Sequence, residues 1–196
     1  MAAFPYRRTI SVEEYLDLDR SSIGVRYEYL DGEVRMMAGG TLDHATICLT
    51  IATLLRSSLR GRSCRVFPSD ARVRISETRY VYPDVTVSCD ERDRGQSDIV
   101  QSPRLVVEVL SPSTERHDRV KKFRAYQQCP TIQEYVLVNT AYPAVELLRR
   151  ERNNLWSYHV FGPDDEVELT SLEVRFRVAD VYEDITFPPE HDNGSL

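Results

Sequence analysis

The chain has 196 residues, of which 41% are hydrophobic and 29% are charged, a composition typical of a globular domain. Its formal net charge of −6 argues against indiscriminate binding of nucleic acid, although a local basic patch would still permit it. We find no apolar run long enough for a membrane span and no signal-peptide core, so we expect a cytoplasmic protein without a membrane partner. The length suits one domain, which we place at residues 1–190, with a disordered tail at 191–196.

The first third of the sequence predicts a short helix, a hairpin and a longer helix. Ser11 followed by acids is typical of a capped helix start. Asp31-Gly32 lies between two alternating runs and is the strongest short-range signal for a β-hairpin. From Thr41 to Arg60 the apolar residues recur with the period of a helix, which Gly61 ends.

The middle of the chain predicts short strands around a charged loop. β-Branched and aromatic residues mark strands at Cys64–Phe67, Ala71–Ile75 and Tyr80–Val87. The stretch Asp90–Pro103 is too charged for a core element, and the overlapping segment Cys89–Gln101 forms either a mobile flap over the site or a disordered loop. Leu105–Leu110 is almost wholly apolar, which indicates a strand covered on both faces.

The last part predicts a second helix, ending near Gln128, and then a strand and a hairpin across Glu134–Phe161. This order of elements predicts an α/β or α+β fold around one mixed sheet. The cysteines are scattered without metal-binding spacing, so we expect reduced, mostly buried thiols. They are Cys48, Cys64, Cys89 and Cys129.

Two acids are candidates for a site because their surroundings disfavour a charge. Glu108 is flanked by valines in the apolar strand, where a buried carboxylate costs several kcal/mol unless a cation or hydrogen-bond donors meet it. Pro83 cannot donate to a sheet ladder, so we expect an irregularity there that aims Asp84 out of the pleat.

Lysine is rare in this chain: arginine supplies 23 of the 25 cationic residues, and the only lysines are Lys121 and Lys122. Either lysine chemistry is needed there or the pair is a chance survivor of a strong arginine bias. Asp118, Lys122 and Tyr126 share one side of the predicted helix, with Lys122 at the edge of its buried arc and Lys121 facing water. The expected buried arc consists of Val120, Phe123 and Tyr126.

Two acids and a lysine beside a sheet suit the hydrolysis of a phosphodiester. Carboxylate oxygens of Asp84 and Glu108 would hold a hard divalent cation, Mg²⁺ (or Mn²⁺). The cation would polarise the phosphate and acidify a water that Lys122 orients. The alternative is purely structural, with Glu108 and Lys122 as a buried ion pair and Asp84 capping a turn.

Seven separated segments carry a further pattern. They are Tyr27–Glu33, Met37–Thr41 with His44, Phe67–Asp70, Tyr82–Val85, Val107–Thr114, Asp118–Tyr126 and Glu134–Val138. In this order they resemble the Uma2 family of restriction-endonuclease-like proteins, a branch of the PD-(D/E)XK nuclease superfamily. The resemblance covers nearly the whole chain.

The resemblance implies a restriction-endonuclease-like core, in which helices flank a central mixed sheet, with an added N-terminal hairpin. It also implies a homodimeric nuclease that acts on DNA, with Asp84 and Glu108 as metal ligands, Lys122 as the catalytic lysine and Glu28 as an auxiliary acid. The superfamily usually places its lysine two residues after the glutamate, where this chain has Leu110. The family is thought to take it from the following helix instead.

Four residues near these motifs have two interpretations each. His44 is either a half-buried, hydrogen-bonded histidine or a participant in the site. Glu28 is either a site acid or a solvated strand residue. Asp118 is either a supporting acid or a helix N-cap, and Tyr126 is either only a packing residue or one whose hydroxyl also binds a site acid.

Two other functions fit the same residues. A nuclease-fold module that binds nucleic acid or a protein partner without turnover agrees with the acidic net charge and with the missing lysine at Leu110. The two acids would also serve as general acid and base in the hydrolysis of another ester.

Overall fold

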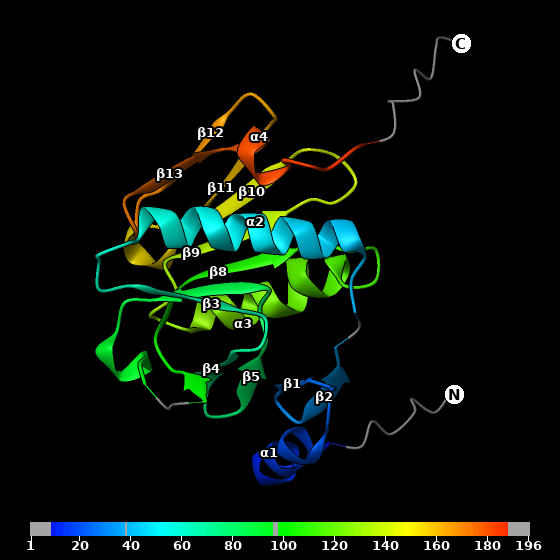
Figure 1. The fold of residues 1–196 in the computed structure, drawn as a ribbon. Coiled ribbons are helices and arrows are strands. Elements are labelled where there is room, and N and C mark those ends of the chain that lie inside the picture. Colours follow the sequence, from blue (N-terminus) through cyan, green and yellow to red (C-terminus); the bar gives the residue numbers. More distant parts are fainter. Residues whose placement is uncertain (1–8, 38, 96–97, 188–196) are drawn as a thin grey trace, which may run out of the picture.

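The computed structural model describes residues 9–37, 39–95 and 98–187, and a six-stranded mixed sheet lies at its centre (Figure 1). The tail expected at 191–196 lies outside these residues. Strands β8 and β9 are parallel, and all other neighbours in this sheet are antiparallel. In spatial order its strands are β11 (Trp156–Phe161), β10 (Val145–Arg150), β9 (Glu134–Val138), β8 (Pro103–Val109), β6 (Val85–Ser88) and β3 (Arg65–Pro68).

The N-terminal hairpin belongs to a second sheet, so the expectation of one sheet is wrong. The hairpin turns at Asp31 and Gly32, whose φ angles of 51° and 95° suit the tight turn that this dipeptide predicts. The five strands are β2 (Glu33–Met36), β1 (Tyr27–Leu30), β5 (Arg79–Val81), β4 (Arg72–Ser76) and β7 (Ile99–Val100). A third, two-stranded sheet contains β12 (Glu166–Leu169) and β13 (Val174–Arg177).

The strand expected at Tyr80–Val87 is interrupted at Pro83 and Asp84. Its first part, β5, pairs with β1 and β4 in the hairpin sheet, whereas its second part, β6, pairs with β3 and β8 in the central sheet. A proline cannot donate to a ladder, so the chain leaves one sheet here and enters the other. Asp84 therefore lies at the junction between the two sheets.

Helices cover both faces of the central sheet (Figure 1). Helix α2 (Leu42–Ser58) buries Ile47, Ile51 and Leu55 on one face, as the apolar spacing predicts. Helix α3 (Phe123–Gln128) packs Tyr126 on the other face. The described residues also contain the helices α1 (Val12–Ser21) and α4 (Val178–Val181). Within the described ranges no helix is long and apolar enough to cross a bilayer. That residues 1–190 form a single domain stays a prediction.

A π-helical turn, His117–Lys122, leads directly into α3. The backbone N–H of Phe123 bonds to the carbonyl of Asp118, five residues earlier. This wider turn rotates the faces of the helix relative to a regular α-helix. Val120 is therefore 43% exposed rather than in the buried arc, a correction to the expected set, while Asp118 and Lys122 are both buried.

Cys64 and Cys89 form a disulfide, which corrects the expectation that all four cysteines are reduced. They lie next to the paired residues Arg65 and Ser88 of β3 and β6, so strand pairing places them opposite each other. Only Cys48 and Cys129 are free thiols.

The charged segment after β6 is anchored and does not cover the acids. Asp93 is only 3% exposed, and its carboxylate accepts hydrogen bonds from Ser88 Oγ (2.6 Å) and the backbone N–H groups of Gln101 (2.8 Å) and Ser102 (2.9 Å). None of its described residues lines the cavity beside Asp84 and Glu108. The flap and the disordered loop are therefore both wrong for the described parts of this segment.

We expect Arg72→Met to destabilise the fold by about 3–5 kcal/mol, because it leaves a buried carboxylate unpaired. Arg72 is buried, and its Nη1 lies 2.9 Å from Oδ2 of Asp19, itself only 6% exposed and also bonded by the Tyr82 hydroxyl. Arg74→Met is the matched control on the same strand, since Arg74 bonds only a backbone carbonyl of its own hairpin. Urea unfolding should show a loss of about 1 kcal/mol or less for the control; equal losses would contradict the role of Arg72.

Candidate active site

Three carboxylates surround the ammonium group of Lys122. Its Nζ lies 2.7 Å from Glu28 Oε1, 2.8 Å from Glu108 Oε1 and 3.5 Å from Asp118 Oδ1. Lys122 is 3% exposed, and the three acids are 4%, 4% and 2% exposed. The sequence therefore predicted the meeting of Lys122 and Glu108 correctly. Glu28 is a buried residue of β1 and not a solvated strand acid.

Asp84 reaches the same cluster from the junction between the sheets. Its Oδ2 accepts a 2.7 Å hydrogen bond from the backbone N–H of Val109, the residue after Glu108 on β8. Neither this bond nor the nearby His44 ring uses Oδ1. Asp84 and Glu108 thus lie beside each other at the end of the two neighbouring strands, with one polar oxygen of Asp84 fixed by the backbone.

Two tyrosine hydroxyls, one from α3 and one from β9, hold the cluster in place. The Tyr126 hydroxyl donates to Glu108 Oε1 at 2.7 Å, as expected for a packing residue that also binds a site acid. The Tyr135 hydroxyl donates to the backbone carbonyl of Asp118 at 3.2 Å. The N-cap interpretation of Asp118 is wrong, because this residue lies inside the helical turn with its backbone N–H bonded to Thr114.

The charges in this cluster do not balance. Glu28, Asp84, Glu108 and Asp118 supply four carboxylates, against one ammonium from Lys122 and one guanidinium from Arg35. Burial raises the pKa of Glu108 well above its usual value, against the opposing effect of Lys122, and the neighbouring acids add to the rise. Burial alone would lower the pKa of Lys122, but Glu108, Glu28 and Asp118 together raise it. The lysine therefore stays protonated, and the site attracts further positive charge.

His44 contacts both Asp84 and the end of β8. Its Nε2 lies 3.1 Å from the Val109 carbonyl oxygen and 3.6 Å from Asp84 Oδ2, and its side chain is 18% exposed. The Asp84 carboxylate raises the pKa of His44, although burial opposes this. The half-buried, hydrogen-bonded histidine is thus confirmed. The potential ligand atoms of His44, Cys48 and Asp84 all lie within 4.8 Å of one another.

Gly40 makes room for the His44 ring. A Cβ at this position would lie 2.7 Å from the ring atoms Cγ and Nδ1, closer than side-chain carbons tolerate.

We expect Gly40→Ala to displace the His44 ring and to weaken binding of a divalent cation as much as His44→Ala does, with a stability loss of about 1–3 kcal/mol. Gly39→Ala is the control, because no atom lies within 4 Å of the place that its Cβ would take. Calorimetric titration measures the Mn²⁺ affinity, and a wild-type affinity in Gly40→Ala would contradict this expectation.

A cavity of about 60 Å³ connects these groups, which is room enough for ordered water. Sequence reasoning missed two of its lining residues, His117 and Arg35. Burial and the Arg35 charge lower the pKa of His117 to about 4, so this ring is neutral at pH 7 and its 3.7 Å contact with Glu28 is not an ion pair there. A basic residue in a predicted hairpin gives no sequence signal that it borders a cavity.

The donor set suits a hard divalent cation. Asp84 and Glu108 offer carboxylate oxygens on one cavity, and both hydrogen-bond donors to Glu108 use Oε1 rather than Oε2. The Val109 carbonyl and His44 lie beside them. Oxygen ligands are those that Mg²⁺ and Mn²⁺ prefer, and the excess of carboxylates supplies the negative charge.

The architecture is that of restriction-endonuclease-like proteins. It superposes on the crystal structure of a protein from Anabaena variabilis, described as "a putative nuclease belonging to DUF820", with a TM-score of 0.74 and 19% identity. The match covers 89% of this chain and 98% of that one. At this identity the match shows the fold.

The sequence profile of the Uma2 family, described as "Putative restriction endonuclease", matches residues 12–179. The chain belongs to the Uma2 family. It is 37% identical to the Synechocystis protein slr1290 over 187 residues, which are 95% of this chain and 96% of that protein. It is 29% identical to sll1609 of the same organism over 172 residues, or 85% and 96% of the two chains.

Proposed function

We propose that the protein is a metal-dependent nuclease that hydrolyses phosphodiester bonds of DNA. The observation that carries this proposal is the buried cluster in which four carboxylates, three of them paired with Lys122, line one small cavity. A phosphodiester substrate brings further negative charge, so such a site requires a cation before it admits a phosphate. The family's description as a restriction endonuclease supports nucleic acid as the substrate.

In this proposal Asp84 and Glu108 would hold Mg²⁺ or Mn²⁺, and His44 supports Asp84. The ion would supply a positive charge that polarises the phosphate and lowers the pKa of the attacking water. Asp84 is held for this role by the backbone N–H of Val109, and Glu108 by the Tyr126 hydroxyl. Because these contacts fix both carboxylates on the ends of strands, little reorganisation is needed on binding.

Lys122 orients the attacking water and stabilises the negative charge that develops on the phosphate. Its raised pKa keeps it a hydrogen-bond donor at neutral pH rather than a base. Glu28 acts as the auxiliary acid that, with Asp118, fixes the ammonium group. A lysine from the helix thus replaces the one that the superfamily usually carries at the position of Leu110.

The test is cleavage of supercoiled plasmid and linear DNA by the purified protein with and without Mg²⁺ or Mn²⁺. We expect wild-type cleavage to need the cation, and Glu108→Gln to reduce it by about 1000-fold or more, because metal catalysis contributes several kcal/mol. Glu166→Gln, an exposed acid on β12, is the control and should cleave normally. Cleavage that survives in Glu108→Gln would refute the proposal.

The second candidate is a nuclease-fold module that binds nucleic acid or a protein partner without turnover. The ion pairs that already occupy the Lys122 ammonium favour it, and the net charge of −6 favours the protein partner. In that case DNA binding would weaken steeply with salt but would not respond to Mg²⁺, and no cleavage would appear at any cation concentration.

We further propose a homodimer formed through the edge strand β11. Tyr158 and Val160 lie on the same face of this strand and are 57% and 59% exposed. Exposed apolar residues on an unpaired sheet edge favour association with a second chain. Light scattering coupled to gel filtration tests this, since a monomer at micromolar concentration would contradict it.

A further inference from the structure

A second, larger cavity lies at the other end of the central sheet from the acidic cluster. Its volume is about 680 Å³, within the range of small-molecule pockets. It opens where β8 and β9 begin, at Arg104 and Glu134, whereas Glu108 lies near the end of β8. Arg104 and Glu108 are four residues apart on one strand, or about 13 Å. The two cavities share no lining residue.

Arginines dominate the charge of this cavity. Arg104, Arg149 and Arg150 line it, together with the acids Glu134 and Asp90. Glu134 is paired with Arg149 at 2.9 Å, and Asp90 with Arg92, which lies outside the cavity. No carboxylate of the described ranges lies within ion-pair distance of Arg104 or Arg150. Arg150 already donates from Nε, Nη1 and Nη2 to oxygens of the protein, so Arg104 supplies the guanidinium charge that remains unbalanced.

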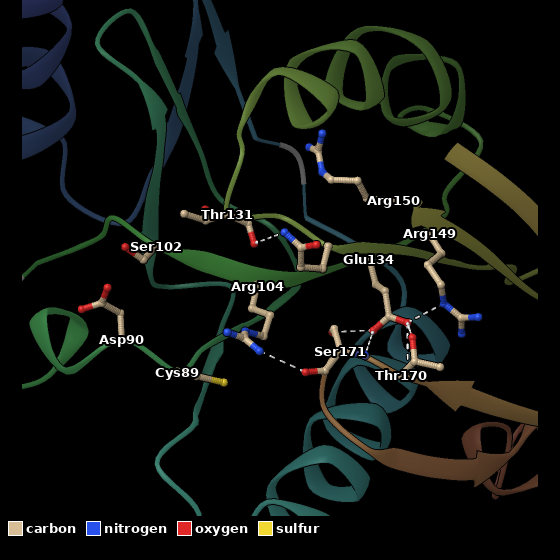
Figure 2. A pocket seen from close by; sticks show the side chains of 11 residues that line it. Cys89, Asp90, Ser102, Arg104, Thr131, Glu134, Arg149, Arg150, Thr170 and Ser171 are labelled. Atoms are coloured by element: carbon tan, nitrogen blue, oxygen red, sulfur yellow. Dashed lines mark hydrogen bonds and ion pairs between the residues drawn. The ribbon is translucent and has the colours of Figure 1, made fainter. Parts of the chain in front are cut away.

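Each of the three arginines donates to backbone carbonyls before any ligand arrives, and Figure 2 shows the contact of Arg104 with Ser171. Arg150 donates to carbonyls at the end of α3, Arg149 to the Glu168 carbonyl, and Arg104 to the Ser171 carbonyl at 3.2 Å. Burial lowers the pKa of Arg150, which reflects a desolvated charge with no acid beside it. Side chains fixed in this way lose little conformational entropy when an anion binds.

Glu134 fixes the floor of the cavity. This carboxylate is fully buried and accepts hydrogen bonds from the backbone N–H groups of Thr170 (3.0 Å) and Ser171 (3.2 Å), besides Arg149. Figure 2 shows these groups converging on Glu134, with Arg104 directed toward Ser171 from the neighbouring strand. The acid is thus saturated by protein donors, and its charge is not presented to a ligand.

We propose that this cavity binds the phosphate group of a nucleotide-sized ligand. Guanidinium groups match phosphate oxygens in geometry and charge, and the remaining wall is polar, with the hydroxyl groups of Ser102 and Thr131. The volume exceeds that of a phosphate ion and has room for an attached nucleoside. The proposal is independent of nuclease activity, because the cavity shares no residue with the acidic cluster.

The test is calorimetric titration of the full chain with inorganic phosphate and with deoxyadenosine monophosphate, at low salt and without divalent cations. We expect saturable binding of both probes, tighter for the nucleotide, and at least about tenfold weaker binding by Arg104→Gln, which removes one charge-assisted contact. Arg56→Gln, an exposed arginine on α2, is the control and should bind as the wild type does.

Arg104 is exposed, so the variant should fold normally, which its melting temperature checks. Phosphate binding that equals nucleotide binding would restrict the site to the phosphate group and overturn the nucleotide part of the proposal. Absence of saturable binding by the wild type, or binding that Arg104→Gln leaves unchanged, would overturn it entirely.

Discussion

Asp84→Asn should abolish metal-dependent DNA cleavage and weaken Mn²⁺ binding at least tenfold, while the protein stays folded. The amide oxygen can still accept the hydrogen bond from the Val109 N–H, so the substitution removes mainly the negative charge. We expect cleavage to fall by about 1000-fold or more, since a metal ligand contributes several kcal/mol to the barrier. Plasmid nicking and calorimetric titration with Mn²⁺ measure the two effects.

Asp70→Asn is the matched control for this substitution. Asp70 is exposed, lies before β4 and does not line the acidic cavity. It should leave both cleavage and Mn²⁺ affinity unchanged. If Asp84→Asn kept wild-type affinity for Mn²⁺, Asp84 would not be a metal ligand, even if cleavage were lost.

Lys122→Met should impair both catalysis and stability, because it removes the one ammonium among buried carboxylates. Cleavage should fall by about 100-fold or more, which is the usual contribution of a positioned proton-transfer or charge-stabilising group. The free energy of unfolding should fall by about 3–5 kcal/mol near neutral pH, as expected when one partner of a buried ion pair is removed. Plasmid nicking and urea unfolding measure these losses.

Lys121→Met is an internal control one residue away. Lys121 is half-exposed and pairs with Glu33 at 2.8 Å on the surface, so its loss should cost about 1 kcal/mol or less and leave cleavage intact. Equal effects of the two substitutions would show that the burial of Lys122 carries no special role.

The destabilisation by Lys122→Met should depend on pH. Glu108 already has a raised pKa, and removing Lys122 takes away the charge that opposes this rise. When folding raises the pKa of an acid, its stabilising contribution is fully present below the pKa of the unfolded state. That contribution is lost as the pH rises through the pKa of the folded state. The difference between the variant and the wild type should therefore be larger at pH 8 than at pH 5. A difference that grew on acidification would contradict this.

Local sequence signals predicted those site residues that are recognisable from their immediate neighbours in the chain. Glu108 was recognisable because a single carboxylate interrupts an apolar strand, and Asp84 because Pro83 must interrupt a ladder. Lys122 was recognisable through the scarcity of lysine and its helical spacing from Asp118 and Tyr126. These are properties of short segments, so one sequence suffices to find them.

Other features depend on contacts between distant segments, and the sequence did not predict them. The disulfide of Cys64 and Cys89 follows from the register of β3 and β6, which no local pattern specifies. Glu28 was implied as a site acid by the family resemblance, whereas its burial depends on the hairpin packing against the helix that carries Lys122. The exposure of Val120 follows from a π-helical turn, since a regular helical period places this residue toward the core.

Diffraction from crystals soaked in Mn²⁺ tests the central claim most directly, because anomalous scattering locates the ion without reference to activity. The account predicts one strong peak within about 2–2.5 Å of a carboxylate oxygen of both Asp84 and Glu108, with Lys122 adjacent. No peak at saturating Mn²⁺, or a peak that contacts neither carboxylate, would contradict the proposed metal site and the nuclease mechanism that depends on it.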